Sequence, residues 1–203
     1  DDLSLGAVGG TAVVDSLAVD VGNTLSLTGD VTTADTQNYS GTVKPDDGLT
    51  LNSTNDDTVT FNDKLSPGGD AGVGSLNVDG DFTLASSGTI YATLDNTGTG
   101  GVDYDQINVT GTVDLSSATT PFAGQTNDTV FDTGNSFDTI LNDNTDAVEN
   151  QPSETEVTIS GQKFEIDYNA GADNNDVVLT RITTNLTWTG AGGDDLWSTG
   201  DNW

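Results

Sequence analysis

Short segments in which apolar and polar residues alternate recur along the first 115 residues. Such alternation with period two is typical of β-strands with one buried face. The segments are LSL at 3–5, LAVDV at 17–21, TLSLTG at 24–29, LTL at 49–51, TVTF at 58–61, LNV at 76–78, FTL at 82–84, TIYATL at 89–94, INV at 107–109 and TVDL at 112–115. Gly, Asn, Asp, Ser and Thr fill the intervals, so the pattern predicts an all-β protein with many turns.

An internal similarity predicts how these strands are arranged. SLAVDVGNTLS, from Ser16, resembles SLNVDGDFTLA, from Ser75, so that Leu17 matches Leu76. The offset equals about three coils of about twenty residues, which is a repeat length of solenoids. We therefore expect a right-handed parallel β-helix (a β-solenoid), whose inward Leu, Val and Ile side chains stack into one narrow core. The alternative is a β-sandwich, because its short strands have a similar spacing.

The pattern changes after the predicted β-helix coils of residues 1–118. The segment 119–155, which includes TGNSFDTILNDNTDAVEN, predicts a loop or insertion on the solenoid, with a short helical turn near Ser136–Leu141. Alternation resumes at 155–161, 163–168 and 176–182, so we expect closing β coils within 156–185. The last segment, 186–203, is a Trp-rich tail that acts as a linker or as a joint between subunits.

Charge narrows the classes of partner. The chain has 33 acidic and four basic residues and a formal net charge of −29. This charge repels phosphate groups, so it excludes nucleic acid and anionic membranes as partners. Only four of the acids are glutamates, and aspartate favours turns whereas glutamate suits helices. The acidic composition therefore agrees with a protein of strands and turns.

Missing residue types narrow the chemistry. The chain has no cysteine, histidine or methionine. Disulfides are therefore excluded, and so is the commonest general base. The lack of methionine predicts that the chain is a piece of a longer polypeptide or has lost its N-terminus. No apolar run approaches the roughly 20 residues that span a bilayer, so we expect a secreted, extracellular or cell-surface protein without membrane insertion.

Several motifs resemble one family. GTIYATLDNTGTGGVDYDQINVTGTVDL (88–115) resembles the closing coils of right-handed parallel β-helices in large bacterial surface proteins, namely autotransporter passengers and filamentous-haemagglutinin-like exoproteins. YNAGADNNDVVLT (168–180) and DTQNYSGTV (35–43) are similar to coils of the same family, and TWTGAGGDDLWSTGDNW (187–203) resembles its Trp-rich repeat motif. The resemblance implies adhesion, matrix or surface-layer roles and supplies no catalytic residues.

Clusters of oxygen ligands suggest calcium sites. GGVDYDQI (100–107) approaches the nonapeptide in which turn aspartates of stacked coils share Ca²⁺, and NDNTD (142–146) also gathers oxygen ligands. The two candidate groups are Asp103 with Asp105, and Asp143 with Asn144 and Asp146. The alternative is that these residues only form turns and solvated charge. No other cofactor is expected.

An enzyme and a glycoprotein are further interpretations. Close aspartates such as Asp79 and Asp81, or Asp103 and Asp105, could act as acid and base on a polysaccharide. With 29 aspartates, however, such pairs arise by chance, and no lysine or arginine stands beside them in the sequence, so we expect no catalysis. Five N-x-[ST] sequons are candidate glycosylation sites, at Asn38, Asn52, Asn108, Asn127 and Asn185. A glycan on Asn108 would point outward, because Val109 is expected to be buried.

All three tryptophans lie in the last sixteen residues. They either cap the open end of the solenoid or pack on another copy, since tryptophan buries a large apolar area at interfaces. In the family pattern the Trp motif precedes a coil that begins with acidic residues and L-x-L, and this chain begins DDLSLG. We therefore expect an interface formed by Trp188, Leu196, Trp197 and Trp203 with Leu3 and Leu5.

These observations together predict an extracellular structural or adhesive module. It would associate with itself head to tail, as separate copies or as tandem repeats, and form a fibre or surface array. The alternative is an adhesin passenger that binds a carbohydrate, such as a polysaccharide, or a host cell surface. A polysaccharide-active enzyme is the third and weakest interpretation.

Overall fold

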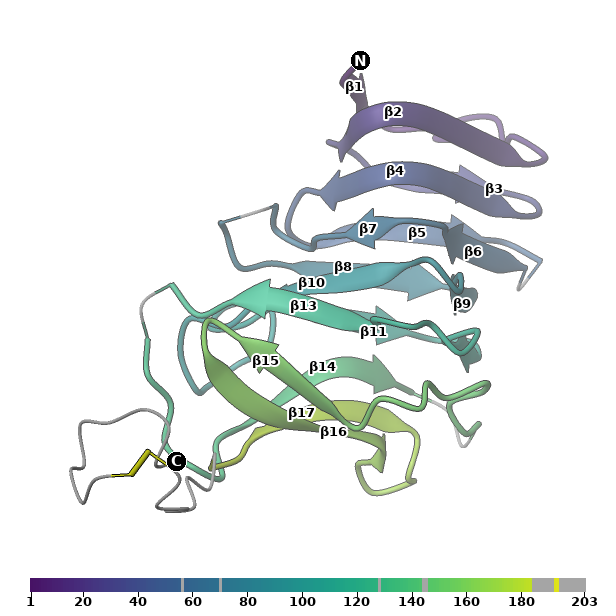
Figure 1. The fold of residues 1–203 in the computed structure, drawn as a ribbon. Coiled ribbons are helices and arrows are strands. Elements are labelled where there is room, and N and C mark those ends of the chain that lie inside the picture. Colours follow the sequence, from purple (N-terminus) through teal and green to yellow (C-terminus); the bar gives the residue numbers. More distant parts are fainter. Residues whose placement is uncertain (56, 70, 128, 144–145, 184–191, 194–203) are drawn as a thin grey trace.

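The regular elements that the structure describes are all β-strands (Figure 1). The computed structural model describes residues 1–203 apart from 56, 70, 128, 144–145, 184–191 and 194–203. The prediction of an all-β protein is therefore confirmed.

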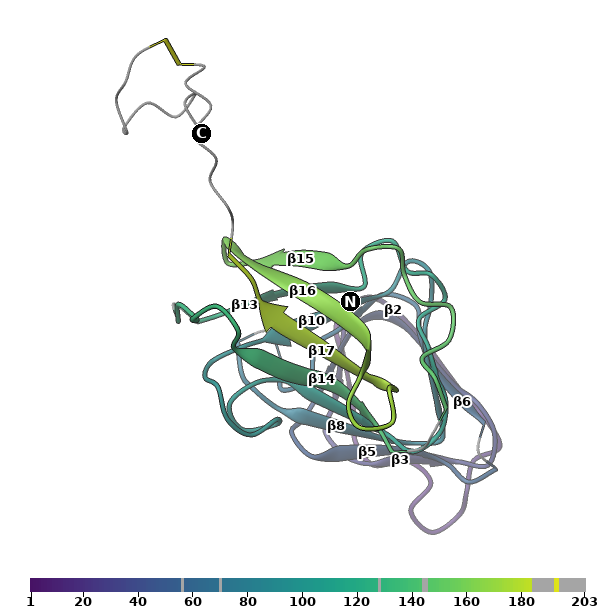
Figure 2. The same cartoon turned by 90° about the horizontal axis from the view of Figure 1, so that it is seen from below.

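The strands form two sheets that curve around one core (Figure 2). The first sheet is parallel and contains β1 (Leu3–Leu5), β2 (Leu17–Leu27), β4 (Gln37–Pro45), β6 (Thr58–Phe61), β7 (Lys64–Leu65), β9 (Asp81–Leu84), β10 (Thr89–Thr93), β12 (Val113–Asp114) and β13 (Phe122–Gln125). The second sheet is mixed and contains β3 (Val31–Thr33), β5 (Leu49–Ser53), β8 (Ser75–Asp79), β11 (Gln106–Val109), β14 (Ser136–Asn142), β17 (Asp176–Arg181), β16 (Gln162–Ala170) and β15 (Glu156–Ile159).

Up to β14 the chain passes back and forth between the two sheets, and one passage through both of them is called a circuit here. From β4 to β14, each strand pairs in parallel with a strand from one circuit earlier. Near the N-terminus the paired residues are roughly twenty positions apart, as in Val31 beside Leu51. Farther along they are more than thirty apart, as in Ile107 beside Ile140, because the turns between strands become longer. The predicted repeat of about twenty residues thus holds only for the first circuits.

Alternating burial explains why these segments are strands. In β5, Leu49, Leu51 and Ser53 are buried, whereas Thr50 and Asn52, which alternate with them, are half-buried. Parallel register places such inward residues above one another, so the buried residues of both sheets form one core. Aromatic rings stack inside it, with Tyr39 and Phe61 at 5.5 Å between ring centroids and Phe61 and Phe82 at 5.6 Å.

The second sheet closes the C-terminal end of this core. After β14 its neighbours are β17, β16 and β15, and each of these pairs is antiparallel. Seen from below, these strands cross the end of the fold (Figure 2). They bring Phe164, Ile166 and Leu179 into the core. The strands predicted within 156–185 are therefore present, but they form an antiparallel cover rather than further parallel coils.

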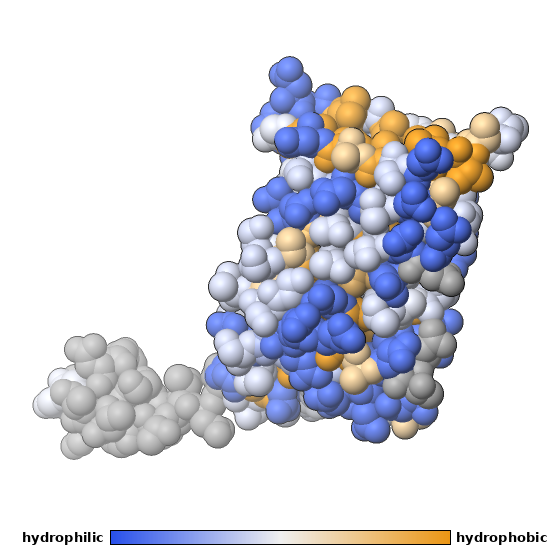
Figure 3. All heavy atoms as spheres, turned by 90° about the vertical axis from the view of Figure 1, so that its right-hand side faces the viewer, coloured by the Kyte–Doolittle hydropathy of each residue, from blue (hydrophilic) through white to orange (hydrophobic). Residues whose placement is uncertain are grey.

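The N-terminal end lacks such a cover among the described residues. Leu3, Val13 and Val14 are exposed there by 44%, 51% and 38%. Leu17 and Val19 are only partly buried against the core. Figure 3 shows apolar surface gathered at this end of the molecule. In the described part of the chain, the core is therefore covered by strands at its C-terminal end and uncovered at its N-terminal end.

Two expectations for residues 119–155 are wrong. The segment is not an insertion beside the sheets, because it contributes β13 to the first sheet and β14 to the second. The expected helical turn near Ser136–Leu141 lies in β14. A register shift between Asp138 and Ile140 interrupts the alternation there, and this explains why the sequence pattern did not indicate a strand.

The internal similarity does not mark equivalent positions. Leu17 lies in β2 of the first sheet, whereas its match, Leu76, lies in β8 of the second. The residues that face one another across the ladders are different ones, as in Val19 with Tyr39 and Tyr39 with Phe61. Alternation alone produces matching sequences in either sheet, so the similarity identified strands without identifying their neighbours.

The central aromatic stack provides a test of the core. Replacing Phe61 by alanine removes a fully buried ring between Tyr39 and Phe82, and we expect a loss of about 3–5 kcal/mol in the free energy of unfolding. Urea denaturation measures this loss. Val130→Ala is the control, since Val130 is 83% exposed and its truncation should change stability by less than about 0.5 kcal/mol. Equal effects of the two substitutions would contradict the described core.

Candidate functional site

Aspartate carboxylates bind backbone N–H groups of neighbouring circuits. Asp30 accepts a hydrogen bond from the Thr50 N–H at 2.9 Å, and Asp47 accepts one from the Ser75 N–H at 2.8 Å. The same contact recurs from Asp2 to Thr24, Asp63 to Gly41, Asp81 to Thr112, Asp105 to Gly74 and Asp176 to Asn142. Where the carboxylate is ionised, such a hydrogen bond is stronger than a neutral one. These seven aspartates therefore tie neighbouring strands of the stack together.

Asp105 is the most enclosed of these carboxylates. Its side chain is 2% exposed, and its two oxygens accept hydrogen bonds from the Gly74 N–H at 2.8 Å and the Thr93 N–H at 2.7 Å. Burial raises the pKa of Asp105 to about 8, although both backbone donors act in the opposite direction. Asp105 thus binds the backbone just before β8, at Gly74, and the end of β10, at Thr93.

The predicted calcium ligands are placed differently from one another. Asp103 accepts a hydrogen bond from the Thr99 N–H at 2.8 Å within its own turn, while the Asp105 carboxylate is enclosed. Asp143 and Asp146 are exposed, and Asn144 lies outside the described residues. In the described part of the chain no three His, Cys, Asp or Glu side chains are grouped as metal ligands. Calcium binding stays a prediction.

The aspartate pairs considered for catalysis have structural contacts. Asp79 accepts hydrogen bonds from the Asn52 amide and the Thr110 hydroxyl. Asp81 accepts one from the Thr112 N–H at 2.7 Å. Both aspartates therefore form hydrogen bonds between neighbouring circuits.

The four sequon asparagines that the structure describes lie on the outer side of the strands or in turns. Asn38 and Asn127 are exposed, whereas Asn52 and Asn108 are half-buried, and Asn185 lies outside the described residues. The Asn108 amide donates to Asn77 at 3.0 Å, one circuit away. Val109 beside it is 1% exposed, so the prediction that Asn108 faces outward next to a buried valine is confirmed.

The residues expected at the joint fall at opposite ends of the chain. Leu3 is exposed and Leu5 is half-buried at the uncovered N-terminal end. Trp188, Leu196, Trp197 and Trp203 lie outside the described residues. The structure thus places one side of the expected joint on an apolar surface, and the interface itself stays a prediction.

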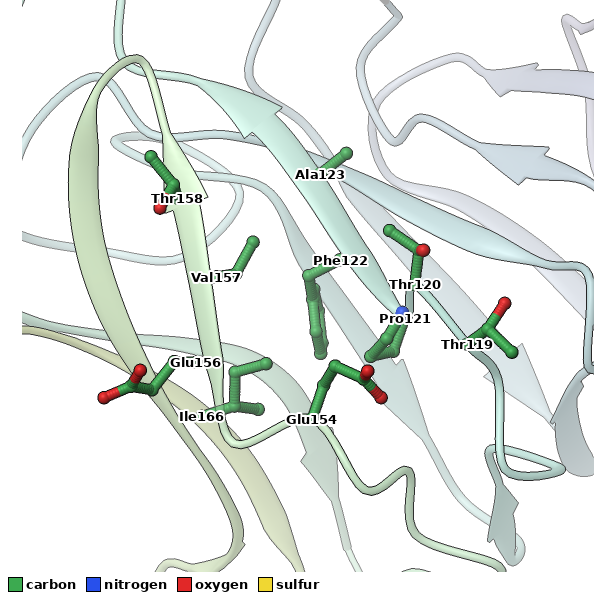
Figure 4. Close-up of a pocket in the computed structure, with 10 residues that line it drawn as sticks. All are labelled: Thr119, Thr120, Pro121, Phe122, Ala123, Glu154, Glu156, Val157, Thr158 and Ile166. Carbon is green, nitrogen blue, oxygen red and sulfur yellow. The ribbon is translucent and has the colours of Figure 1, made fainter.

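A cavity between β13 and β15 was not anticipated from the sequence. It has a volume of about 410 Å³. Figure 4 shows Phe122, Val157 and Ile166 around it, with Glu154 and Glu156 also at its edge. The cavity forms where the two sheets meet without pairing, and no sequence motif reports such a junction.

A second hollow crosses several circuits on the outer face of the first sheet. It has a volume of about 440 Å³ and is mostly polar. Its lining comes from four successive circuits and comprises Val21, Gly22, Asn23, Gly41, Thr42, Asp63, Lys64, Ser87 and Thr89. The Lys64 ammonium lies 3.8 Å from the centre of the Tyr91 ring. Hydroxyl, amide, acid and ammonium groups therefore share one groove.

No family model, no curated protein and no solved structure matches this chain. Among the described residues, no helix is long and apolar enough to cross a membrane.

The buried Asp105 leads to a prediction of how the free energy of unfolding depends on pH. Its pKa is raised in the folded protein, so its contribution to stability is fully present below the unfolded pKa, about 3.8, and is lost as the pH rises toward about 8. Asp105→Asn is neutral at every pH. We expect the unfolding free energy of the variant, relative to wild type, to improve between about pH 5 and about pH 9 in urea denaturation.

The control for this experiment is Asp143→Asn, at an exposed aspartate. Its stability relative to wild type should not change over the same interval. If Asp105→Asn behaves in the same way, the raised pKa of Asp105 is wrong.

The calcium prediction is tested by thermal denaturation. A specific site at residues 143–146 would raise the melting temperature in millimolar Ca²⁺ over that in chelator, because a ligand that binds only the folded state stabilises it. Asp143→Asn should then remove the increase. An unchanged melting temperature in chelator contradicts a specific site.

Proposed function

We propose that the chain is a module of a right-handed parallel β-helix, extracellular, with a structural or adhesive role. The alternation of strands between two sheets and their parallel register up to β14 support this interpretation of the fold. In a β-helix each circuit is stabilised by the next one, so the module would extend a surface structure by stacking. The module would act by binding other molecules or other copies of itself rather than by catalysing a reaction.

The functional proposal rests on the apolar surface of the uncovered N-terminal end. Leu3, Val13 and Val14 expose apolar side chains there, and Leu5 and Leu17 are incompletely buried. Unpaired strand edges next to apolar surface favour association with another chain. We propose that this end accepts the Trp-rich tail, 186–203, of a second copy or of a tandem repeat.

The difference between the two ends determines the geometry of such an assembly. One end has the antiparallel cover of β15, β16 and β17, and the other is uncovered. A contact between unlike surfaces is heterologous, and it produces an open filament when its rotation does not close. The proposal is therefore a head-to-tail array. Because each copy has a net charge of −29, assembly should strengthen as salt screens the repulsion.

The polar groove favours a second candidate function. Its lining of Asn23, Thr42, Lys64, Ser87 and Thr89 offers donors and acceptors along several circuits. Such a surface suits the hydroxyl groups of a carbohydrate chain that lies along the stack. Binding of a carbohydrate or host surface is the alternative, and in it the tail serves only as a cap. A glycan that binds the chain lacking 186–203 as well as the intact chain would favour it.

Deletion of 186–203 tests the proposed assembly. We expect the intact chain to form multimers or fibres in analytical ultracentrifugation and electron microscopy, and the deleted chain to be monomeric. Leu3→Asp should also reduce assembly, because it places a charge on the apolar end. Val130→Asp is the matched control, at an exposed valine, and should assemble normally.

Two results would contradict the proposal. One is assembly that survives the deletion, and the other is an intact chain that stays monomeric at high concentration and moderate salt.

A further inference from the structure

At the N-terminal end, β1 covers only one half of β2. It pairs with Leu25–Leu27, and in the described chain no strand pairs with Leu17–Val21 on the side of β2 that faces away from β4. Figure 1 shows β1 beside the C-terminal end of β2 only. The second sheet continues at this level through single bridges of Val8 and Val14 to β3. Within the described residues, the first circuit therefore lacks a strand over Leu17–Val21.

The burial of side chains along β2 shows what such a strand would cover. Leu25 and Leu27, which lie beside β1, are fully buried. Leu17, Val19 and Val21 are only partly buried, although they pack on the same core. Figure 3 shows apolar surface at this end of the molecule. The two halves of one strand thus differ because one half has a neighbour on both sides and the other half has not.

The backbone of β2 directs hydrogen-bonding groups to the uncovered side. The Leu17 N–H donates to the Thr36 carbonyl at 3.0 Å, on the side of β4. In a parallel ladder the N–H and C=O groups of one residue point to the same side, and those of the next residue point to the opposite side. The N–H and C=O groups of Ala18 and Asp20 therefore point away from β4.

The covered half of β2 follows the same alternation. The Leu27 carbonyl accepts from the Asp46 N–H at 2.9 Å, just after β4, whereas the Thr28 N–H donates to the Leu5 carbonyl of β1 at 2.9 Å. A further strand beside the uncovered half would receive the hydrogen bonds of that half as β1 receives the one from Thr28. Such an edge next to apolar surface is a template for pairing with another chain.

The first residues of the chain limit the length of the added strand. Asp2 accepts a hydrogen bond from the Thr24 N–H at 3.2 Å, and the Asp1 nitrogen lies 3.8 Å from where a Cβ on Gly22 would stand. A strand parallel to β2 would therefore run toward Asp1 and would have to turn away there, because β1 occupies the next position. In the tail, residues 186–189 are followed by Gly-Ala-Gly-Gly at 190–193, and glycine permits such a turn.

The charges at this end favour an uncharged strand. Asp1, Asp2, Asp15 and Asp20 lie in or beside the uncovered edge, so two N-terminal ends that paired with each other would bring like charges together. The tail segment NLTWTG at 185–190, which lies outside the described residues, carries no charge. Its leucine and tryptophan alternate with threonines, as the apolar residues of 17–21 alternate with Ala and Asp. The tail therefore has the pattern that the edge requires.

The distance along the stack places this tail segment on another copy. In the second sheet β14, β11, β8 and β5 lie between β17 and β3, so β17 and β3 are about 24 Å apart at about 4.8 Å per strand. β17 ends at Arg181, and the five residue steps from Arg181 to Leu186 span at most about 17 Å. Leu186 therefore cannot reach the uncovered half of β2 in its own chain.

We propose that residues 186–189 of one copy form a parallel strand over residues 17–21 of the next copy or repeat. The inference rests on the proposed head-to-tail function and specifies its contact. Leu186 would lie beside Leu17, and Trp188 beside Val19. Since Val19 already lies beside Tyr39 of β4, the indole would continue a column of large side chains. Backbone hydrogen bonds supply affinity in strand addition, and the inward side chains supply specificity.

This register determines which backbone groups of the tail are bonded. In a parallel pair a residue donates to the carbonyl that precedes its partner and accepts from the N–H that follows it, as Leu17, the partner of Gln37, donates to Thr36. The Ala18 N–H would therefore donate to the Leu186 carbonyl, and the Ala18 carbonyl would accept from the Trp188 N–H. The N–H groups of the two tail threonines would point away from β2.

The experiment uses the intact chain, diluted until ultracentrifugation shows a monomer, and a capped hexapeptide with the sequence of residues 185–190. Titration followed by amide NMR should shift the signals of residues 17–21. Hydrogen exchange at Ala18 and Asp20 should slow by about tenfold or more as their N–H groups become bonded. Val19 is the internal control, since its N–H points to β4, and its exchange should change by less than about twofold.

Two methylated peptides test the register. Methylation of the backbone nitrogen of Trp188 removes the N–H that would bond to β2, and the affinity of the peptide should fall by about tenfold or more. Methylation at Thr189 changes an N–H that points away, and the affinity should fall by less than about threefold. An equal loss for the two peptides, or exchange at Ala18 and Asp20 that the unmodified peptide does not slow, would overturn the strand pairing.

These results separate the strand pairing from the proposed function. If deletion of 186–203 abolishes assembly while both methylated peptides bind equally, the tail joins copies by side-chain packing alone, so the proposed function stands and the strand pairing fails. If the intact chain never assembles and no peptide binds, both fail.

Two other occupants would also overturn the proposal. Slow exchange at Ala18 and Asp20 in the monomeric intact chain, lost on deletion of 186–203, would place the tail on its own chain. A dimer that forms without 186–203 and protects the same two N–H groups would make a second N-terminal end the occupant.

Discussion

The structure depends on one constraint, which is that a circuit cannot bury its apolar side chains without the circuits next to it. A single circuit of about twenty to more than thirty residues cannot enclose its Leu, Val and Phe side chains by itself, so its stability comes from its neighbours. Parallel ladders and the aspartate contacts to backbone N–H groups hold these neighbours in register. Circuits in the middle of the stack therefore have a neighbour on both sides, whereas the circuits at the two ends have a neighbour on one side only.

The two ends resolve this constraint in different ways, and the functional proposals follow from them. At the C-terminal end the second sheet reverses its strand direction and crosses the core. That cover leaves the edge of β13 without a ladder partner in the described chain, which creates the cavity beside β15. At the N-terminal end apolar side chains such as Leu3 stay exposed. One end thus has a cavity where the two sheets meet, and the other has an exposed apolar surface.

The sequence predicted strands well and their neighbours poorly. TVTF at 58–61 and LSL at 3–5 coincide with β6 and β1, because alternation is a local property of the chain. β14 was missed because a bulge interrupts its alternation, and the antiparallel cover was missed because strand direction leaves no local pattern. Among the candidate site residues, the turn aspartates were seen as ligands or solvated charge. The contact of Asp105 with the Gly74 N–H, 31 positions away, was not foreseen, because it depends on the register of whole circuits.

The antiparallel cover also has a consequence for how the chain folds. The hairpin of β15 and β16 is closed by a tight turn at Ser160 and Gly161, both of which have positive φ, so its contacts are local in sequence. The parallel ladders instead require closure of loops of about twenty to more than thirty residues before any contact is gained, and such closure is slow. The cover is therefore the element best able to form first. Circuits would then add to it in order from the C-terminal end, and folding would proceed against the direction of synthesis.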